Sequence, residues 1–337
     1  IMKKYIKKRN IFFPIDSKSR LYDSITHYTK AHKKIRFKDH QNKIHFGNII
    51  SYKNKWKILD CLKCKFIHCI PIPKAKYLKN FYIKKFYNLK RKKDYFKNGI
   101  ENKKWWNKLF NQRLFLFEKL LKKKGKLLDV GSGPGFFLAE AKKRGWDVKG
   151  LEPSTDAINF SRSIGVKEAI RGDVGDLKNF DEKFDLIYLN GVLEHLPNPK
   201  KLIEMASKIL VKNGLLFFWV ANDFNFFQYL SLCKVKKPWW IMPPEHINYF
   251  QTESFKNLFD KKKYKLEYFN TTFPMELFIL MGKNYVKFSK LGKEAQKMRQ
   301  TFELNFDNSD FLNKFYQNFS NQKLGRAIEI IVRKKTS

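Results

Sequence analysis

Apolar and polar positions follow two alternating patterns from about residue 126 onward. Short apolar runs typical of buried strands are separated by longer stretches with helical spacing. A helix is expected over Asn198–Gly214, where the final glycine suits a helix C-cap. The predicted strands are Lys126–Val130, Asp147–Leu151, Glu168–Arg171, Phe184–Leu189 and Leu215–Val220. This alternation predicts an α/β protein with a parallel, doubly wound sheet.

The C-terminal part of the chain predicts two further strands, Lys263–Phe273 and Arg326–Lys335. Between them, Pro274–Lys323 has helical spacing and is rich in Phe, Leu and Met. We therefore expect a seven-stranded sheet with a helical insertion before its last strand. This insertion is predicted to form a lid over a substrate site.

The N-terminal part is less regular. Ile1–Lys57 shows no clean period and predicts short strands and loops. Trp56–Tyr87 predicts a strand pair around a CxxC motif, followed by a helical segment, and Asn102–Lys123 predicts an amphipathic helix. We expect four segments: 1–100, a small basic N-terminal region; 101–273, the α/β core; 274–323, the lid; and 324–337, the last strand and tail.

Composition limits the class of protein. Hydrophobic residues make up 43% of the chain, enough for a globular core. The longest strongly apolar runs, such as Leu215–Ala221, are far shorter than the roughly 20 residues that cross a bilayer, so no transmembrane segment is expected. The N-terminus has no apolar core or cleavage site of a secretory signal. Four cysteines are too few for a disulfide framework, and we expect a cytoplasmic protein.

The formal net charge of +39 is unevenly distributed, with 37 Lys/Arg against 7 Asp/Glu in residues 1–126. One interpretation is a basic arm that binds a polyanion such as nucleic acid. The other is a compositional bias, because Lys, Asn, Ile, Phe and Tyr are abundant throughout. The lysines are scattered rather than clustered, which favours the second interpretation. Nucleic acid is therefore a partner that the sequence does not favour.

The stretch LLDVGSGPGFFL carries three glycines, Gly131, Gly133 and Gly135, between a predicted strand and a predicted helix. Such a turn typically brings a nucleotide-like ligand to the helix N-terminus. The dinucleotide fingerprint requires a third small residue where this chain has Phe136. No phosphate-binding lysine follows either, so the P-loop is excluded as well.

Residues Asp129–Gly135 resemble the first motif of the class I S-adenosylmethionine-dependent methyltransferases. The resemblance implies a Rossmann-like sheet and S-adenosyl-L-methionine as cofactor. It also implies that the three glycines let the backbone approach the methionine and ribose parts of this cofactor. Asp129 is included among the expected cofactor-binding residues.

Later segments match the same family in order. Glu152, at the end of the second strand, is expected to accept hydrogen bonds from both ribose hydroxyls. Asp173 is expected at the adenine amino group, with Val174 against the ring, although Asp176 competes for the role of Asp173. Asn190 ends the fourth strand, where the family's backbone meets the methionine moiety.

The segment Phe184–Pro199 resembles the ubiquinone-biosynthesis O-methyltransferase branch of the family. Together these motifs cover roughly Lys126–Asp223. More loosely, Pro243–Phe269 resembles the C-terminal half of the same branch. The segment CLKCKFIHCIPIPKAKYLKNFY resembles a CxxC-containing extension that precedes many of these domains.

Methyl transfer from a sulfonium is an in-line displacement, in which the protein aligns the acceptor and removes its proton. His195 and His246 are the candidate bases, because histidine titrates near neutral pH. Glu194 and Glu245 precede them and either orient them or act as the base. Each histidine also has a structural interpretation. His195 could instead close the cofactor pocket, and His246 could instead bond to the backbone of its loop.

Substrates of open α/β sheets bind beyond the carboxyl ends of the strands. Asn222 and Asp223, which follow the fifth strand, are therefore expected substrate contacts. Tyr249 lies in a proline-flanked loop and is expected to contribute as well. Trp239 and Trp240 either stack on a substrate ring or cap the core.

Cys61 and Cys64 have the spacing of a zinc ribbon, but a structural zinc site needs four ligands. A second CxxC is absent. Cys69 is a candidate third ligand, and the candidates for a fourth are His40, His45 and His68. Because the second pair is missing, we predict that the CxxC region is not a full zinc site and that the chain binds no metal.

The sequence thus predicts an S-adenosylmethionine-dependent methyltransferase that acts on a small molecule or glycan precursor, with O-methylation favoured. One alternative is an RNA methyltransferase that uses the basic N-terminal region. Against it, the fourth strand ends in LNGVLEHL rather than in the Asn/Asp-Pro-Pro-aromatic tetrad of amino-directed base methyltransferases. Another alternative is an inactive binding module with the same fold, against which the intact glycine turn and Glu152 argue.

Overall fold

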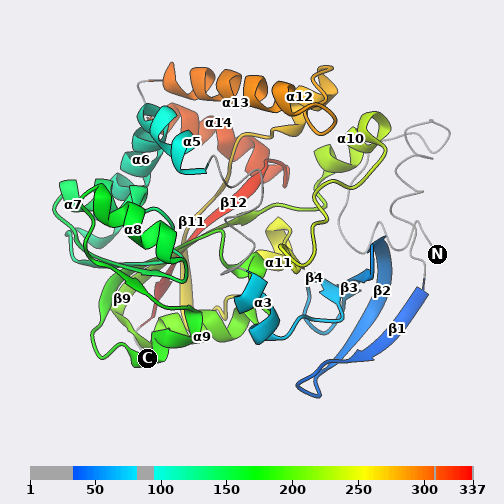
Figure 1. Cartoon of the computed structure of the whole chain (residues 1–337), viewed down its shortest axis with the longest axis horizontal. Coiled ribbons are helices and arrows are strands. Elements are labelled where there is room, and N and C mark those ends of the chain that lie inside the picture. Colours follow the sequence, from blue (N-terminus) through cyan, green and yellow to red (C-terminus); the bar gives the residue numbers. More distant parts are fainter. Residues whose placement is uncertain (1–32, 82–94, 307–308, 336–337) are drawn as a thin grey trace.

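The computed structural model describes residues 33–81, 95–306 and 309–335 (Figure 1). Two sheets and the helices around them make up this part of the chain. No helix in these ranges combines the length and the apolar character needed to cross a bilayer. The expectations for residues 1–32, and for the helical segment beyond residue 81, fall outside the described ranges.

The larger sheet has seven strands in the order β11-β12-β9-β8-β5-β6-β7. β5 pairs in parallel with both β6 and β8, so the chain reverses its direction of winding around β5. β12 is antiparallel to both of its neighbours. The strands are β5 (Lys126–Val130), β6 (Asp147–Glu152), β7 (Ala169–Arg171), β8 (Phe184–Asn190), β9 (Leu210–Ala221), β11 (Tyr264–Thr271) and β12 (Ala327–Lys334). The predicted seven-stranded, doubly wound sheet is confirmed.

Helices cover both faces of this sheet. Adjacent residues of β5 show the arrangement, because Leu127 packs toward α6 and α7 while Leu128 packs toward α9 and α11. Both side chains are fully buried, and each such burial stabilises the fold by about 1.5–3 kcal/mol. The helices around the sheet are α5 (Tyr95–Glu101), α6 (Lys103–Leu121), α7 (Phe136–Lys143), α8 (Thr155–Ser163), α9 (Pro199–Lys208), α10 (Phe226–Val235) and α11 (Thr252–Lys256), with the 3₁₀ turns η2 (Val174–Asn179) and η3 (Leu193–His195).

The expected helix over Asn198–Gly214 is too long. Asn198 caps α9 by accepting a hydrogen bond from the Lys201 amide, as a good N-cap residue does. The helix ends at Lys208, and Gly214 lies within β9 instead. The reason is strand pairing, because the Ile209 carbonyl already accepts a hydrogen bond from the amide of Phe184 in β8.

The smaller sheet is antiparallel, with the order β1-β2-β3-β4-β10. Its first four strands come from the N-terminal region, and β10 comes from a loop of the α/β core. The two parts share one apolar cluster, in which Ile58 and Ile67 lie with Tyr229 and Trp240. Its strands are β1 (Lys33–Lys38), β2 (Ile44–Lys53), β3 (Trp56–Cys61), β4 (Ile67–Ile70) and β10 (Asn248–Tyr249), followed in sequence after β4 by α3 (Ala75–Phe81).

Three helices form the insertion between β11 and β12, as the helical spacing predicted. They are α12 (Glu276–Leu280), α13 (Ser289–Leu304) and α14 (Ser309–Asn321). α12 contacts α10, α13 contacts α6, and α14 lies against β11 (Figure 1). The insertion therefore extends from the carboxyl end of β11 across to α6.

Candidate active site

The glycine turn lies between β5 and α7, and all three glycines have positive φ angles of 77°, 54° and 77°. A Cβ at Gly135 would lie 2.3 Å from the Ser161 side chain, so packing alone requires glycine there. A Cβ at Gly133 would meet nothing within 4 Å. Gly133 is thus favoured by its φ of 54° rather than by packing, and its position leaves space beside the turn for a ligand.

Glu152 lies against the same turn. One carboxylate oxygen accepts a hydrogen bond from the Gly133 amide at 2.9 Å, and the other accepts one from the Ser154 amide at 2.8 Å. Burial, followed by the charge of Glu152, raises the pKa of Asp129 well above its ordinary value. Asp129 therefore holds its proton to higher pH than an exposed carboxyl does, and Glu152 is positioned at the turn as an acceptor.

After β7, Asp173 caps η2 by accepting a hydrogen bond from the Gly175 amide at 2.8 Å. Asp176 accepts a hydrogen bond from the Asp173 amide at 2.8 Å, which completes a capping box. Val174 packs partly buried against the main apolar cluster. The carboxylates of Asp173 and Asp176 are thus both engaged with the backbone, and these contacts favour neither over the other as the contact to a ligand.

The segment after β8 lies against the glycine turn. Asn190 ends the strand and is half-buried, and Gly191 follows with a φ of 71°. A Cβ at Gly131 would lie 3.1 Å from Cγ2 of Val192. The beginning of the VLEHL segment therefore packs onto the proposed cofactor turn.

The two Glu-His pairs meet in one place. One carboxylate oxygen of Glu194 and one ring nitrogen each of His195 and His246 all lie within 4.8 Å of one another, and the two imidazole centroids are 5.0 Å apart. Nδ1 of His195 lies 2.5 Å from the backbone carbonyl of Glu245, to which it donates as the Nδ1–H tautomer. Nε2 of His195 is then the acceptor nitrogen. We call Glu194, His195 and His246 the histidine corner.

Glu194 is the buried acid of this corner, with 2% of its surface exposed. Burial raises its pKa from the ordinary 4.5 to about 8, and the nearby charge of Asp223 adds to this effect. Oε2 of Glu194 is buried without a hydrogen-bond partner among the described residues. The backbone carbonyl of Glu245 accepts the hydrogen bond from His195, so Glu245 orients the imidazole of the corner from outside it.

A second polar cluster follows the end of β9. Asp223 is 2% exposed, and burial raises its pKa to about 7 despite the opposing charge of Arg326. Arg326 donates to Glu276 at 2.8 Å, and Gln228 donates to Asp223 at 3.4 Å. The sequence reasoning missed Arg326 and Glu276. The only signal was their position, directly before the last strand and at the start of the insertion.

Two expected substrate contacts have structural roles instead. Nδ2 of Asn222 donates to the carbonyls of Lys323 and Gly325, which ties β9 to the segment before β12. Tyr249 is fully buried, and its hydroxyl donates to the His246 carbonyl at 2.9 Å. Burial therefore removes Tyr249 from the expected substrate contacts. Trp240 is likewise in the core, at 2% exposure.

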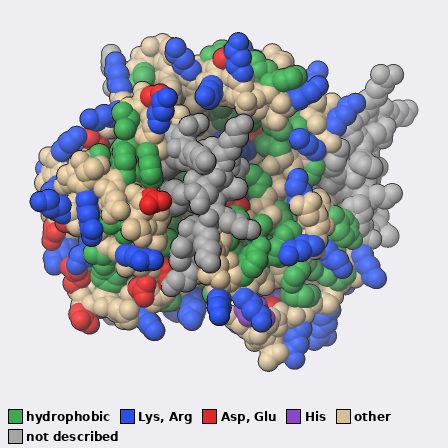
Figure 2. All heavy atoms as spheres, viewed as in Figure 1, with side chains coloured by type: hydrophobic (Ala, Val, Ile, Leu, Met, Phe, Trp, Pro, Cys, Tyr) green, Lys and Arg blue, Asp and Glu red, His purple; other side chains and the backbone are tan. Residues whose placement is uncertain are grey.

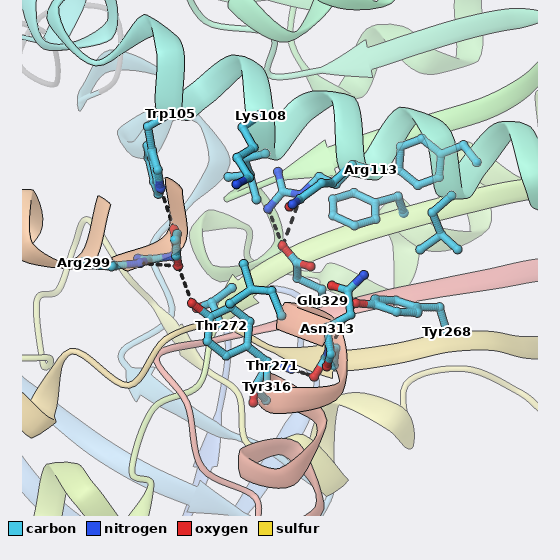
Figure 3. A pocket seen from close by; sticks show the side chains of 18 residues that line it. Trp105, Lys108, Arg113, Tyr268, Thr271, Thr272, Arg299, Asn313, Tyr316 and Glu329 are labelled. Carbon is cyan, nitrogen blue, oxygen red and sulfur yellow. Dashed lines mark hydrogen bonds and ion pairs between the residues drawn. The ribbon is translucent and has the colours of Figure 1, made fainter. Parts of the chain in front are cut away.

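A separate cavity lies between α6, β11 and the helices α13 and α14 (Figure 3). Arg113 on α6 reaches Glu329 of β12 and Tyr188 of β8 across this cavity. Glu303 of α13 accepts hydrogen bonds from Trp105 and from Tyr316. The bonds of Glu303 attach the insertion to the core, because they join α13 and α14 to α6.

Comparison with known proteins gives a match over residues 103–268 to a family model described as a methyltransferase domain. The ubiquinone biosynthesis O-methyltransferase of Coxiella burnetii is 30% identical over 37% of this chain and 60% of its own length. The enzyme of the same name from Pasteurella multocida is 29% identical over 29% of this chain and 46% of its own length. The matched region thus spans less than two thirds of these relatives. The structure of the plantazolicin methyltransferase BpumL in complex with SAH is 15% identical, with a TM-score of 0.47, over 77% of this chain and 94% of its own.

Proposed function

Starting from a chain whose residues 103–268 belong to the class I S-adenosylmethionine-dependent methyltransferases, we propose that this protein methylates an oxygen atom of a small molecule or glycan precursor. The observation that carries the proposal is the contact between Glu152 and the amide of Gly133, at a turn whose central glycine faces open space. The donors of this turn and the acid beside it lie at the carboxyl edge of the sheet, where ligands of such sheets bind.

The residues present fit S-adenosylmethionine. Glu152 offers carboxylate oxygens to the ribose hydroxyls, and its hydrogen bonds to the backbone fix its orientation beforehand. Asp173 and Val174 lie after β7 for the adenine, and Asn190 lies after β8 for the methionine moiety. When bound, the cofactor supplies an electrophilic methyl group.

The histidine corner supplies the base. The hydrogen bond from Nδ1 of His195 to the Glu245 carbonyl leaves Nε2 able to accept the proton of an acceptor hydroxyl. Glu194, protonated at neutral pH because of its raised pKa, adds no negative charge that would compete for this proton. His246 lies edge-on to His195 and is the second candidate base.

The acceptor is proposed to lie between this corner and the buried Asp223–Arg326–Glu276 cluster. Because α12 begins at Glu276 and contacts α10, we assign the lid function to α12. α13 and α14 instead brace the insertion against α6 (Figure 3). This division refines the expected lid over residues 274–323.

On the face seen in Figure 2, the arrangement of charge among the described residues favours a small acceptor over RNA. Lys and Arg side chains are spread over the face seen in Figure 2 and do not gather into one strip. Nucleic-acid sites typically concentrate such charge along a groove or a helix. Comparing the metabolites and glycans of a deletion strain with those of its parent identifies the acceptor as a species lighter by one methylene.

The cofactor assignment is tested with Gly133→Val against Gly165→Val. Both glycines have positive φ, and a Cβ at either meets nothing within 4 Å, but Gly165 follows α8 away from the turn. The backbone strain of a branched residue is therefore matched. We expect Gly133→Val to weaken S-adenosylmethionine binding at least about tenfold by calorimetry, whereas Gly165→Val binds as the parent does. Equal affinity in both variants contradicts the assignment.

A further inference from the structure

Three strands of the smaller sheet bring together four side chains that the sequence separates. His45 comes from β2, Cys61 ends β3, Cys64 lies in the following turn, and His68 lies in β4. One ligand atom from each of the four lies within 4.8 Å of the other three. We call these residues the Cys-His cluster.

The distances in this cluster suit a tetrahedral metal ion. Zinc bonds of about 2.0–2.3 Å in tetrahedral geometry place neighbouring ligand atoms roughly 3.3–3.8 Å apart. Nδ1 of His45 lies 3.3 Å from Sγ of Cys64 and 3.8 Å from Sγ of Cys61. Small side-chain movements therefore suffice to complete four bonds.

The outer nitrogen of each histidine has a polar partner that orients the ring. Nδ1 of His68 donates to the Cys69 carbonyl at 3.0 Å, and Nε2 of His45 lies 3.3 Å from Asp39. Carbonyl and carboxylate partners of this kind commonly hold metal-binding histidines. Nε2 of His68 is buried with no hydrogen-bond partner among the described residues, and the side chain is 2% exposed. A buried nitrogen of this kind is costly unless something binds it.

We propose that His45, Cys61, Cys64 and His68 bind one structural Zn²⁺ ion. This proposal reverses our expectation from the sequence, which rested on the missing second CxxC. Two histidines, from the strands on either side of β3, take the place of that pair. Cys69, which the sequence offered only as a candidate third ligand, lies outside the cluster and packs in the apolar core beside β10.

The position of the cluster gives the ion a role in the candidate active site. His68 pairs with Asn248 where β4 meets β10. The Asn248 side chain donates to the carbonyls of Leu193 at 3.0 Å and Leu196 at 2.7 Å, on either side of His195. By fixing β3 and β4, the ion would hold β10 and, through it, the loop that carries His246. The zinc thus stabilises the histidine corner without taking part in the chemistry.

The test is elemental analysis of the full chain, purified without a polyhistidine tag, with zinc and iron both measured. We expect one zinc per chain in the parent protein and its loss in Cys61→Ser, Cys64→Ser and His68→Gln. Three control variants, Cys69→Ser, Cys233→Ser and His40→Gln, change the same residue types outside the cluster and should keep the zinc. His246→Gln should also keep it, which separates this site from the histidine corner.

The variants that remove a zinc ligand could lose zinc because they unfold. A second measurement therefore uses the parent protein. Replacing zinc by Co²⁺ should produce the visible absorption of a tetrahedral ion with thiolate ligands, and a chelator should abolish it. Iron in place of zinc, a Cys61–Cys64 disulfide in the parent protein, or zinc retained in the Cys61→Ser/Cys64→Ser double variant would each overturn the proposal. The Gly133→Val experiment tests the cofactor assignment separately, so its result does not depend on whether zinc is found.

Discussion

The two sheets of this protein build their sites in different ways. In the seven-stranded sheet, the proposed cofactor site comes from turns that follow successive parallel strands, β5, β6, β7 and β8. In the five-stranded sheet, β4 pairs with β10, and residues almost two hundred positions apart become neighbours. The residues of the proposed cofactor site therefore lie in local sequence motifs. The sites of the smaller sheet form only when segments distant in the sequence pair.

The histidine corner depends on both sheets. His195 follows β8 of the larger sheet, whereas His246 directly precedes the segment that joins the smaller one. Asn248 connects them by donating to backbone carbonyls on either side of His195. We therefore expect the larger sheet to set cofactor binding and the smaller sheet to set the position of the base. Three measurements separate these two contributions.

The largest effect is expected from removing the base. Deprotonation by a positioned side chain typically contributes about 100- to 10,000-fold to turnover. His195→Ala or His246→Ala should therefore lower kcat at least about 100-fold, with S-adenosylmethionine affinity changed only a few fold. We favour His195 because its Nδ1 is already oriented by the Glu245 carbonyl.

Steady-state kinetics with the identified acceptor checks this expectation, and His40→Ala serves as an exposed control. Turnover near that of the parent in both single variants and in the double variant would remove the histidines from the mechanism. Alignment of an acceptor that is already ionised would then be sufficient.

A smaller effect is expected from Glu152→Ala, which acts on the larger sheet alone. Hydrogen bonds to a charged group contribute about 1.5–3 kcal/mol, or roughly 10- to 150-fold in S-adenosylmethionine affinity. Glu168→Ala is the control, because this acid precedes β7 at the opposite edge and pairs with Lys142. Calorimetry should show weaker binding only for Glu152→Ala, and unchanged affinity there would move the ribose acceptor elsewhere.

The smallest increment, taken per pH unit, is expected in the pH dependence of stability at the point where the sheets meet. The folded-state pKa of Glu194, about 8, is higher than its ordinary value of 4.5. The folded state thus retains a proton that the unfolded state releases, and stability should fall as pH rises between these values. The slope approaches about 1.4 kcal/mol per pH unit for one such group, and Asp223, with a pKa of about 7, adds to it.

Urea unfolding from pH 5 to pH 8.5 measures this slope. Glu194→Gln should reduce it, because the amide does not titrate, whereas Glu204→Gln on the exposed face of α9 should leave it unchanged. The same slope in parent and Glu194→Gln would show that the carboxyl is better solvated in solution than its 2% exposure indicates.

The turns of the proposed cofactor site could be predicted from the sequence because their signals are local. β5 was predicted with its observed bounds, and the glycines, Glu152 and Asp173 lie at the end of a strand or in the turn after it. The Asn198–Gly214 helix was predicted too long because the pairing of Ile209 with β8, a contact between separate elements, ends it early. Arg326 and Glu276 were missed for the same reason, since their pairing joins segments fifty residues apart.

By itself, the sequence determined the strand and helix alternation, the doubly wound sheet and the glycine turn with its acid. Periodicity and turn chemistry act over a few residues, so these features can be predicted from the sequence without knowing the fold. Only the tertiary structure decided that the two Glu-His pairs form one corner, that Tyr249 is a buried brace, and that His45 and His68 join Cys61 and Cys64. Those outcomes depend on which strands become neighbours, and antiparallel pairing of β2, β3, β4 and β10 brings together side chains whose spacing in the sequence carries no period.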